Sequence, residues 1–555
     1  MARSAFVTTP GEFDFVVIGS GFGGSVSALR LAEKGYRVAV LEQGRRWTPE
    51  DLPRTNWNLA RWVWRPALGL RGFFNMRFFR HVVVLHGCAV GGGSITYGNT
   101  LLVPPEHVWQ QGSWAGLGEW QKEMPAHYEC AKRMLGVTVN RRLGPVDHRL
   151  QEMAKVVGAE STFYPTDVGV FFGPEGATPG TSHDDPYFGG EGPSRKSCIG
   201  CGGCMVGCPH DAKNTLDKNY LFLAERRGAK VFPETKVVDV RPAGNKDGTD
   251  GYIIETVSTA VGGKKQRKQM RARGIVFAAS SLGTQELLFQ LRECGSLPAI
   301  SLALGQRVRT NAESLIAVRF PGSKLDLSEG IGIGSGLHID AHTHIEAVRY
   351  PKGSDSMGLM TTVMTLGRPG WTRVFTWIGT LAKQLLTHPV TTLRAMSPFG
   401  FARETMIFLC MQTLDGHLTM RWERPWFWPF KKTLMTHGQP IPTFIPAAND
   451  FAVKAARATG GIAQTTLSEI LLNVPMTAHC MGGAAMGRNA AEGVCDGQNR
   501  VFGYRNMYVC DGSMLGANLG VNPSLTITAL TERAMSKIPD AQHQDWNAIG
   551  MENAT

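Results

Sequence analysis

Four of the eleven cysteines lie close together and have the spacing of metal-binding thiolates. Cys198, Cys201, Cys204 and Cys208 follow the pattern Cys-x2-Cys-x2-Cys-x3-Cys, and Pro209 comes next. Bacterial ferredoxins bind an iron–sulfur cluster with this spacing. The intervening glycines leave room for a cubane and supply N–H donors to its sulfurs. Because the chain has no second run of this kind, a lone [4Fe–4S] cluster would need Cys208 to fold back or a remote thiol to join.

Two other interpretations of this cysteine cluster stay open. Four thiolates also suit a tetrahedral structural zinc ion. The run is equally compatible with a metal-free cysteine-rich turn or a disulfide. An odd number of cysteines in so long a chain does not fit a secreted disulfide scaffold, so metal or redox chemistry is the first expectation.

The N-terminal region carries a glycine motif of the kind that binds dinucleotides. Gly19, Gly21 and Gly24 directly follow the apolar run 15–18. In such a motif the first glycine permits a tight turn, the second lets the backbone approach a pyrophosphate, and the third allows the helix to contact the sheet. Glu42 ends the next apolar run. Its carboxylate there would accept ribose hydroxyls and disfavour a 2′-phosphate.

The elements around this motif form a complete βαβ unit, with strands predicted at 15–18 and 37–41 and a helix at about 25–34. A second glycine-rich loop, with Gly91, Gly93 and Ser94, follows an apolar strand and would let the backbone approach a flat cofactor or its phosphates. Further strands are predicted at 230–232, 235–241 and 274–279, with a helix from about 280. Between about 300 and 470 mixed strands and loops rich in Trp, Met and Thr suit a domain that covers a substrate.

The composition is that of a globular protein. The chain has 555 residues, of which 43% are hydrophobic and 19% charged, which excludes disordered and fibrous classes. No run of 18 apolar residues predicts a transmembrane helix, and the first residues lack the apolar core of a secretory signal. We therefore expect a cytoplasmic location. Lys and Arg exceed Asp and Glu by 58 − 46 = 12, which favours anionic cofactors, membrane surfaces or nucleic acid as partners.

Two segments combine aromatic and basic residues. In the stretch 54–80 six arginines alternate with Trp and Phe and no acidic residue intervenes. Arginine stems packed over aromatics in a lid explain this stretch better than nucleic-acid stacking, so we expect no nucleic-acid partner. The second segment, 422–432, mixes Trp and Phe with cations as interfacial membrane contacts do, and an ordinary buried loop is its alternative.

These motifs, together with two C-terminal segments, 477–483 and 508–533, resemble the glucose-methanol-choline (GMC) family of FAD-dependent alcohol oxidoreductases. Within it the chain is similar to the intracellular bacterial cholesterol-oxidase-like branch, over most of its length. The resemblance implies an α/β fold, in which a Rossmann-like FAD-binding domain carries an inserted α+β substrate domain built on a mostly antiparallel sheet. The implied boundaries are 1–310 for the first part of the FAD domain, with the cysteine-rich segment 198–209, then 311–470 for the substrate domain and 471–555 for the C-terminal part.

The resemblance also implies roles for individual residues. It makes Gly19, Gly21, Gly24 and Glu42 contacts of the ADP-ribose, places Val237 near the adenine, Gly93 and Ser94 by the flavin or pyrophosphate, and Asp511 and Gly512 at the ribityl–phosphate end. His479 and Asn522 would face the substrate carbinol, where a histidine can accept or orient the hydroxyl proton and an amide can donate to a developing oxyanion.

Glu346 is the third implied catalytic residue. It aligns with a glutamate that moves a proton when a sterol double bond migrates. The alternative for Glu346 is a strand residue paired with nearby Arg349.

The expected activity is oxidation of a sterol or similarly bulky hydrophobic alcohol by hydride transfer to FAD, with or without double-bond isomerisation. The electron acceptor is O2 in an oxidase. In a dehydrogenase an iron–sulfur cluster would instead pass electrons to a quinone or protein. A hypothesis of another class is a flavin protein that transfers electrons or binds ligand without alcohol turnover, and His479 and Asn522 argue against it.

Overall fold

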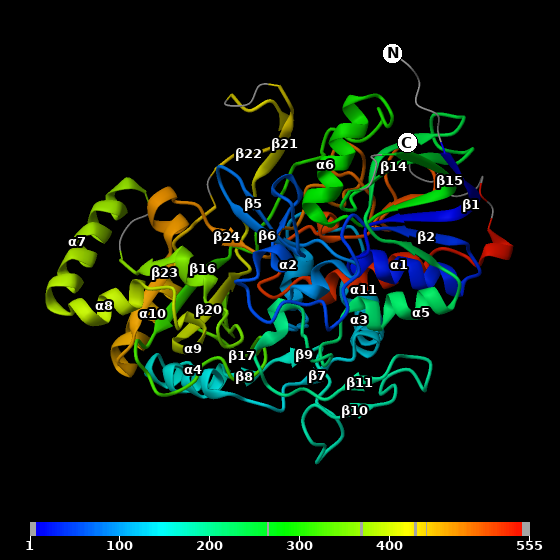
Figure 1. Cartoon of the computed structure of the whole chain (residues 1–555). Coiled ribbons are helices and arrows are strands. Elements are labelled where there is room, and N and C mark those ends of the chain that lie inside the picture. Colours follow the sequence, from blue (N-terminus) through cyan, green and yellow to red (C-terminus); the bar gives the residue numbers. More distant parts are fainter. Residues whose placement is uncertain are drawn as a thin grey trace.

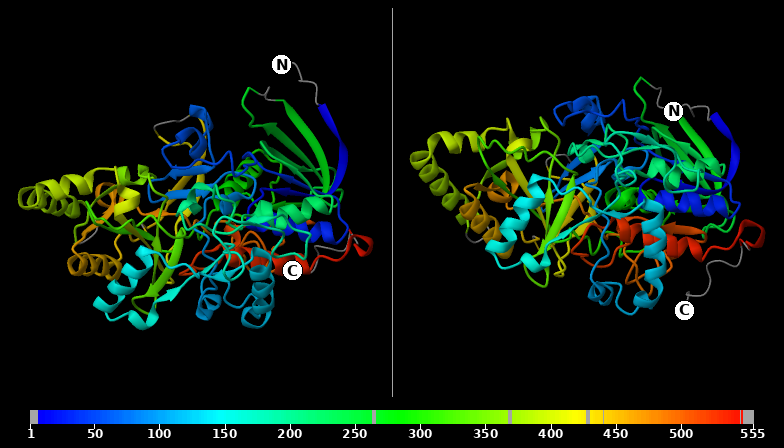
Figure 2. Two further views of the ribbon diagram at one scale, coloured as in Figure 1. Left: turned by 60° about the horizontal axis from the view of Figure 1, so that its bottom comes forward. Right: turned by 90° about the horizontal axis from the view of Figure 1, so that it is seen from below.

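The computed structural model of the chain describes residues 7–262, 266–366, 370–426, 430–439, 441–544 and 546. Two large sheets lie at opposite ends of the molecule, and segments from distant parts of the sequence join them (Figure 1). Two further views show that helices cover each sheet (Figure 2).

The first sheet contains the predicted βαβ unit. Its seven strands run in the order β12-β2-β1-β15-β14-β13, and β25 pairs with β15. The strands are β1 (Val7–Ile18), β2 (Val38–Leu41), β12 (Lys230–Phe232), β13 (Thr235–Pro242), β14 (Tyr252–Ser258), β15 (Arg267–Phe277) and β25 (Met507–Val509). The pairs among β12, β2, β1, β15 and β25 are parallel, whereas β13, β14 and β15 pair antiparallel.

Helices pack against this sheet because its central strands are apolar on both faces, as parallel strands usually are. They are α1 (Phe22–Glu33) and α6 (Ser280–Glu293); α5 (Tyr220–Arg226) and α11 (Ser524–Ser536) pack on α1, and α3 (Trp120–Leu135) packs on α11. The first helix begins at Phe22, earlier than predicted, because Gly21 is its N-terminal cap. The α/β class and the Rossmann-like unit are confirmed.

The second sheet is antiparallel, as the resemblance implied. Its order is β19-β23-β16-β20-β18-β17-β8. The strands are β8 (Tyr164–Pro165), β16 (Ser314–Arg319), β17 (Ile333–His338), β18 (Thr343–Val348), β19 (Thr361–Val363), β20 (Thr405–Gln412) and β23 (Ile462–Thr466). Helices α4 (Pro145–Val156) and α10 (Pro446–Thr459) pack on it. Because β8 and α4 precede most of the first sheet's strands in sequence, the two layers are interleaved along the chain.

A small sheet in the order β24-β6-β5 lies between the two layers. It consists of β5 (Phe74–Phe78), β6 (Val83–Gly87) and β24 (Met476–Thr477). Strand β6 leads into the second glycine-rich loop, and β24 ends two residues before His479. Because β6 and β24 pair in parallel, the second glycine-rich loop and the expected catalytic histidine lie at the same end of the small sheet.

The remaining elements are short connections and one helical hairpin. The strands are β3 (Trp64–Arg65), β4 (Leu70–Arg71), β7 (Thr138–Val139), β9 (Asp167–Val168), β10 (Ser182–His183), β11 (Arg195–Lys196), β21 (Thr419–Glu423) and β22 (Thr433–His437), and the helices are α2 (Leu59–Trp62), α7 (Trp371–Thr387), α8 (Pro389–Met396) and α9 (Phe401–Glu404). Within the described part of the chain no helix has both the length and the apolar character needed to cross a bilayer.

Four aromatic residues of the arginine-rich stretch contribute to the core. Trp62, Trp64, Phe73 and Phe74 are buried, and the rings of Trp62 and Phe74 stack with centroids 4.5 Å apart. These four side chains are therefore engaged in packing.

A buried ion pair connects α4 to the second sheet. Arg349 Nη2 lies 2.7 Å from Asp147 Oδ1, and both side chains are fully buried. Asp147 also accepts hydrogen bonds from the Gly144 N–H and the Ser335 hydroxyl. Three donors thus bind this carboxylate, and removing it would leave a buried guanidinium without its counter-charge.

We expect Asp147→Ala to lower the free energy of unfolding by about 3–5 kcal/mol, because it breaks a buried pair from one side. Urea denaturation followed by circular dichroism measures this change. Glu119→Ala is the matched control, since it removes the exposed partner of Lys122 and should cost less than about 1 kcal/mol. Equal losses in the two variants would contradict the prediction.

Candidate active site

The glycines of the first motif have different surroundings. A Cβ at Gly19 would lie 2.2 Å from the Ala278 carbonyl oxygen, and φ is +103° there. A Cβ at Gly24 would lie 2.1 Å from the Gly19 oxygen. Gly21 has no atom within 4 Å of its Cβ position, and it caps α1 without a side-chain hydrogen bond. Gly19 and Gly24 thus permit close packing, and Gly21 leaves open space at a helix N-terminus, as a pyrophosphate requires.

Two other segments border this open space. In the second glycine-rich loop, a Cβ at Gly92 would lie 2.6 Å from Gly21 Cα. From the other side, the Cys510 carbonyl abuts Gly23. The three segments 19–24, 91–94 and 510–512 therefore converge around the start of α1, which we call the cofactor cradle.

The polar residues expected in the cofactor cradle are held by the protein itself. The Ser94 hydroxyl donates to the Gly91 oxygen (2.7 Å) and accepts from the Leu216 N–H (3.0 Å), so it stabilises the loop. The Asp511 carboxylate accepts from Ser513 and Thr284. Burial raises the pKa of Asp511. Because these contacts hold its carboxyl in place, Asp511 orients the turn before Gly512.

Glu42 lies at the end of β2, as expected. Its carboxylate accepts from the Ser20 N–H (3.2 Å), the Ser20 hydroxyl (2.8 Å) and the Gly44 N–H (2.8 Å). Burial raises its pKa. Carboxylate oxygens have further lone pairs, so ribose hydroxyls fit beside these contacts. Val237 lies on β13 and is buried. It is close to Glu42 in space, since the backbone N–H of Thr235 donates to the backbone carbonyl of Glu42.

Asn99 provides a further test of whether a cofactor fits. It is fully buried, and neither atom of its side-chain amide has a partner among the described residues. Buried amides are rarely left without hydrogen bonds, so such a group near a glycine-rich loop fits a polar ligand. The cradle, its open helix N-terminus and Glu42 together fit the ADP part of FAD.

The expected catalytic histidine faces a buried carboxylate that the sequence analysis missed. His479 Nδ1 lies 3.1 Å from Glu313 Oε2, and Glu313 is 1% exposed. Glu313 also accepts from the Thr477 hydroxyl and the Ala478 N–H. Burial by itself lowers the pKa of His479, but attraction to Glu313, assisted by Glu346, outweighs burial and raises the pKa above its ordinary value.

Glu346 and Asn522, the other two expected catalytic residues, are in direct contact. The Asn522 amide donates to Glu346 Oε2 at 3.1 Å, and Glu346 is fully buried on β18. Burial raises the pKa of Glu346 to about 7. The alternative pairing of Glu346 with Arg349 is wrong, because Arg349 pairs with Asp147 instead.

Two more residues extend this group. His344 Nδ1 lies 4.0 Å from Glu346 Oε1, and His344 Nε2 lies 2.8 Å from the Tyr164 hydroxyl. Burial lowers the pKa of His344 to about 3, so this ring is neutral. The sequence suggested neither residue, because strand pairing across β8, β17 and β18 brings them together.

Asn311 holds the loop that carries Asn522. Its side chain accepts from the Gly520 N–H (2.8 Å) and donates to the Val521 oxygen (2.9 Å). Asn311 and Glu313 both come just before β16, and a polar Asn-x-Glu at the start of a buried strand was the signal that could have found them.

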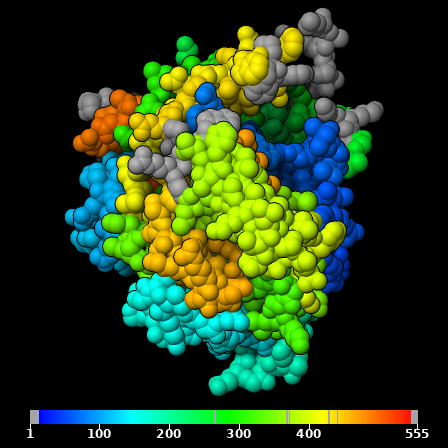
Figure 3. Space-filling view, turned by 90° about the vertical axis from the view of Figure 1, so that its left-hand side faces the viewer, coloured from blue at the N-terminus to red at the C-terminus, as the bar shows by residue number. Residues whose placement is uncertain are grey.

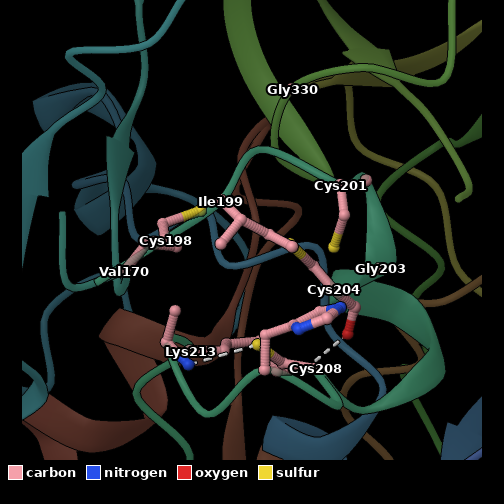
Figure 4. A pocket seen from close by; sticks show the side chains of 12 residues that line it. Val170, Cys198, Ile199, Cys201, Gly203, Cys204, Cys208, Lys213 and Gly330 are labelled. Carbon is pink, nitrogen blue, oxygen red and sulfur yellow. Dashed lines mark hydrogen bonds between the residues drawn. The ribbon is translucent and has the colours of Figure 1, made fainter. Parts of the chain in front are cut away.

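The cysteine cluster lines a small pocket, as Figure 4 shows, together with Val170, Lys213 and Gly330. The Gly200 and Gly332 N–H groups lie 3.4 Å and 3.2 Å from the sulfurs of Cys198 and Cys204. Burial raises the pKa of Cys198 to about 12 and raises that of Cys204 further, which favours neutral thiols. All eleven cysteines are free.

The metal interpretations of the cysteine cluster find no support. Among the residues that the structure describes, no group of three or more His, Cys, Asp or Glu side chains is arranged to hold a metal ion. The buried Lys213 amine instead donates to the Cys204 and Ile95 carbonyls, 2.7 and 2.9 Å away. This turn therefore supports the cofactor loop that ends at Ile95.

Comparison with known proteins agrees with this arrangement. The family model described as GMC oxidoreductase matches residues 440–531, and the one described as FAD binding domain matches residues 14–48. A cholesterol oxidase of Acinetobacter baumannii is 59% identical over 533 residues, which cover 96% of this chain and 95% of that protein. A cholesterol oxidase of Mycobacterium tuberculosis is 44% identical over 548 residues, which cover 96% and 92%.

Solved structures share the fold at much lower identity. Pyridoxine 4-oxidase from Mesorbium loti superposes with a TM-score of 0.59 at 14% identity, covering 96% of this chain and 99% of that one. The FAD-containing formate oxidase of Aspergillus oryzae gives 0.59 at 13% identity, covering 97% and 100%. From the two family models and from relatives of this identity over nearly the whole chain, it follows that the protein is an FAD-dependent member of the GMC oxidoreductase family.

Proposed function

We propose that this enzyme oxidises the 3β-hydroxyl of a sterol or a similarly bulky hydrophobic alcohol, with FAD as hydride acceptor and O2 as electron acceptor. The cholesterol oxidase relatives support the substrate class and the oxidase activity. The observation that carries the proposal is the buried group of Glu346 hydrogen-bonded to Asn522, beside His479 and its partner Glu313. Electron transfer through an iron–sulfur cluster finds no support in the cysteine cluster.

His479 is the group that would hold the hydroxyl proton. Because Glu313 lies beside Nδ1, that nitrogen carries a proton and Nε2 of the neutral ring is left as an acceptor. Nε2 then binds the alcohol O–H and takes its proton as the carbinol carbon loses hydride. The Asn522 amide stabilises the oxygen as charge develops on it. FAD, when bound in the cofactor cradle, supplies the acceptor for the hydride.

Glu346 would move the proton of the isomerisation. A carboxyl with a pKa of about 7 is half ionised near neutrality, so it can both accept and return a proton. In a sterol with a neighbouring double bond, Glu346 removes a proton next to the new ketone and returns it at the far end of that double bond. The side chain is fully buried, which keeps this proton from exchanging with water.

Location in the cytoplasm and contact with a membrane surface stay predictions. A sterol resides in bilayers, so an enzyme with this substrate has to meet a lipid surface.

Purified enzyme should bleach anaerobically when a 3β-hydroxysterol is added, and O2 should restore the colour. We expect His479→Ala to retain FAD but to slow flavin reduction by about 10²–10⁴-fold, because it removes the proton acceptor. Stopped-flow absorbance measures both. A sterol and long-chain alcohol panel that leaves the flavin oxidised would refute the proposed substrate class, and re-oxidation by quinones but not by O2 would refute the oxidase activity.

The rate of flavin reduction should rise with pH as His479 loses its proton, with a midpoint above the ordinary histidine pKa. Glu313→Gln removes the negative charge that raises this pKa, so the midpoint should move to lower pH. Stopped-flow reduction across a pH series, in a Glu346→Gln background that removes the second titrating carboxyl, measures the shift. An unmoved midpoint would show that Glu313 does not act on His479.

Glu346→Gln should leave flavin reduction within about tenfold and abolish isomerisation, since the amide cannot accept the proton. The unconjugated ketone would then accumulate, which chromatography and the missing ultraviolet absorbance of the enone detect. The variant is nearly isosteric, so FAD content serves as the control for folding. Conjugated product formed at the wild-type rate would rule out this role.

A further inference from the structure

A helical hairpin at one end of the molecule carries apolar side chains that nothing covers in the described chain. Helices α7 and α8 form the end farthest from the first sheet (Figure 1), and their yellow-green surface fills the middle of the face in Figure 3. The exposed fractions are 73% for Phe375, 51% for Ile378, 85% for Leu386, 64% for Val390, 62% for Leu393 and 74% for Phe399. Contiguous exposed apolar side chains of this size mark an interaction surface.

The exposed residues of α7 share one face of the helix. At 100° per residue, Phe375, Ile378 and Leu386 lie within an arc of about 80°. Arg373 and Trp377 lie on the opposite face. The helix is therefore amphipathic, and its exposed face is apolar.

The inner face is firmly attached. Arg373 Nη2 lies 2.7 Å from Glu469, and both side chains are buried. The Trp377 indole N–H donates to the Thr362 hydroxyl on β19 at 3.0 Å. The apolar face is thus presented by a fixed element of the second sheet.

The charged residues in the segment that contains the hairpin are all basic. The segment from Ser356 to Arg403 spans 48 residues and contains no Asp or Glu but five Lys or Arg. Of these, Lys383 on α7 and Arg394 on α8 are exposed beside the apolar side chains. Phe399 stacks on Trp57, with centroids 6.4 Å apart, so the surface continues into the acid-free stretch 54–80.

We propose that the hairpin α7–α8 docks this protein onto an anionic phospholipid bilayer. Phe375, Leu386 and Leu393 enter the boundary between headgroups and acyl chains, and Lys383 and Arg394 contact the phosphates. The benefit to the enzyme rests on the proposed function, because sterols reside in bilayers. Binding to lipid itself does not depend on turnover.

The geometry connects the docking face to the active site. Glu469, the partner of Arg373, lies on the short π-helix Ser468–Leu472, and this segment continues through β24 to His479. Leu472, on the same π-helix, is 68% exposed. A lipid surface is also the better match than a second copy of this chain, since an isologous contact would place Lys383 and Arg394 against like charges.

The test is sedimentation of the FAD-loaded enzyme with vesicles of phosphatidylcholine, with and without phosphatidylglycerol. We expect binding to the anionic vesicles that weakens with salt. Phe375→Gln, Leu386→Gln and Leu393→Gln together should reduce partitioning by at least about tenfold, because they remove the apolar contact. Lys383→Glu and Arg394→Glu should each reduce it by about fivefold or more, and this pair keeps the test informative if the apolar variant misfolds.

Matched controls separate this face from others. Leu302→Gln and Val261→Gln change side chains that are 83% and 79% exposed elsewhere, and should bind like wild type. Trp426→Ser with Phe430→Ser tests the other aromatic segment, 422–432, in which these two side chains are 90% and 84% exposed. If the Trp426→Ser, Phe430→Ser variant loses vesicle binding and the hairpin variants retain it, the proposal is overturned. It is also overturned if the wild-type protein binds neither kind of vesicle.

Two further measurements distinguish a failure of membrane docking from a failure of the proposed function. Turnover of detergent-dispersed sterol should be unchanged in the hairpin variants. If the wild-type enzyme does not turn over this sterol, the proposed function is refuted, and vesicle binding still tests membrane docking separately. Light scattering reports the oligomeric state. A wild-type dimer that the hairpin variants convert to a monomer would show that this face joins two copies of the chain, and would overturn membrane docking.

Discussion

The contact between Glu313 and His479 is the interaction on which the site depends. A carboxylate buried away from water needs a partner, and this one has a histidine, a threonine hydroxyl and a backbone N–H. The contact determines which imidazole nitrogen carries a proton and raises the pKa of His479. Glu346, a few side chains away, has no full counter-charge, so burial raises its pKa to about 7. The two carboxyl groups thus have different partners, a histidine for Glu313 and an amide for Glu346.

The interleaved topology follows from the need to bring these groups to the cofactor. The cofactor cradle is built on the parallel strands of the first sheet, whereas Glu346 lies on β18 and Glu313 comes just before β16 of the second sheet. The small sheet with β6 and β24 connects them, since one strand leads to the second glycine-rich loop and the other to His479. Asn311 positions the loop that carries Asn522, because its side chain hydrogen-bonds the backbone of residues 520 and 521. His479 and Asn522 are therefore positioned by strand ends and short loops, whereas Glu346 lies within β18.

Buried polar contacts also stabilise the cysteine cluster. Its sulfurs accept backbone N–H groups, and the neighbouring Lys213 joins the cysteine turn to the cofactor loop through carbonyl oxygens. The turn supports the cradle from outside. The helical hairpin differs, because it directs apolar side chains outward from a buried ion pair and is the part of the second layer that faces away from the flavin domain.

Local sequence was sufficient for the elements whose physics is local. The glycine spacing and apolar runs determined the βαβ unit, and the motif around His479 and Asn522, through its resemblance, identified the family. Tertiary structure decided what depends on partners distant in sequence. Glu346 contacts Asn522 instead of Arg349, Glu313 lies beside His479, and burial raises the pKa of the Cys198 thiol. Charge, pKa and metal binding depend on which groups meet in a desolvated space, and only the folded chain brings those groups together.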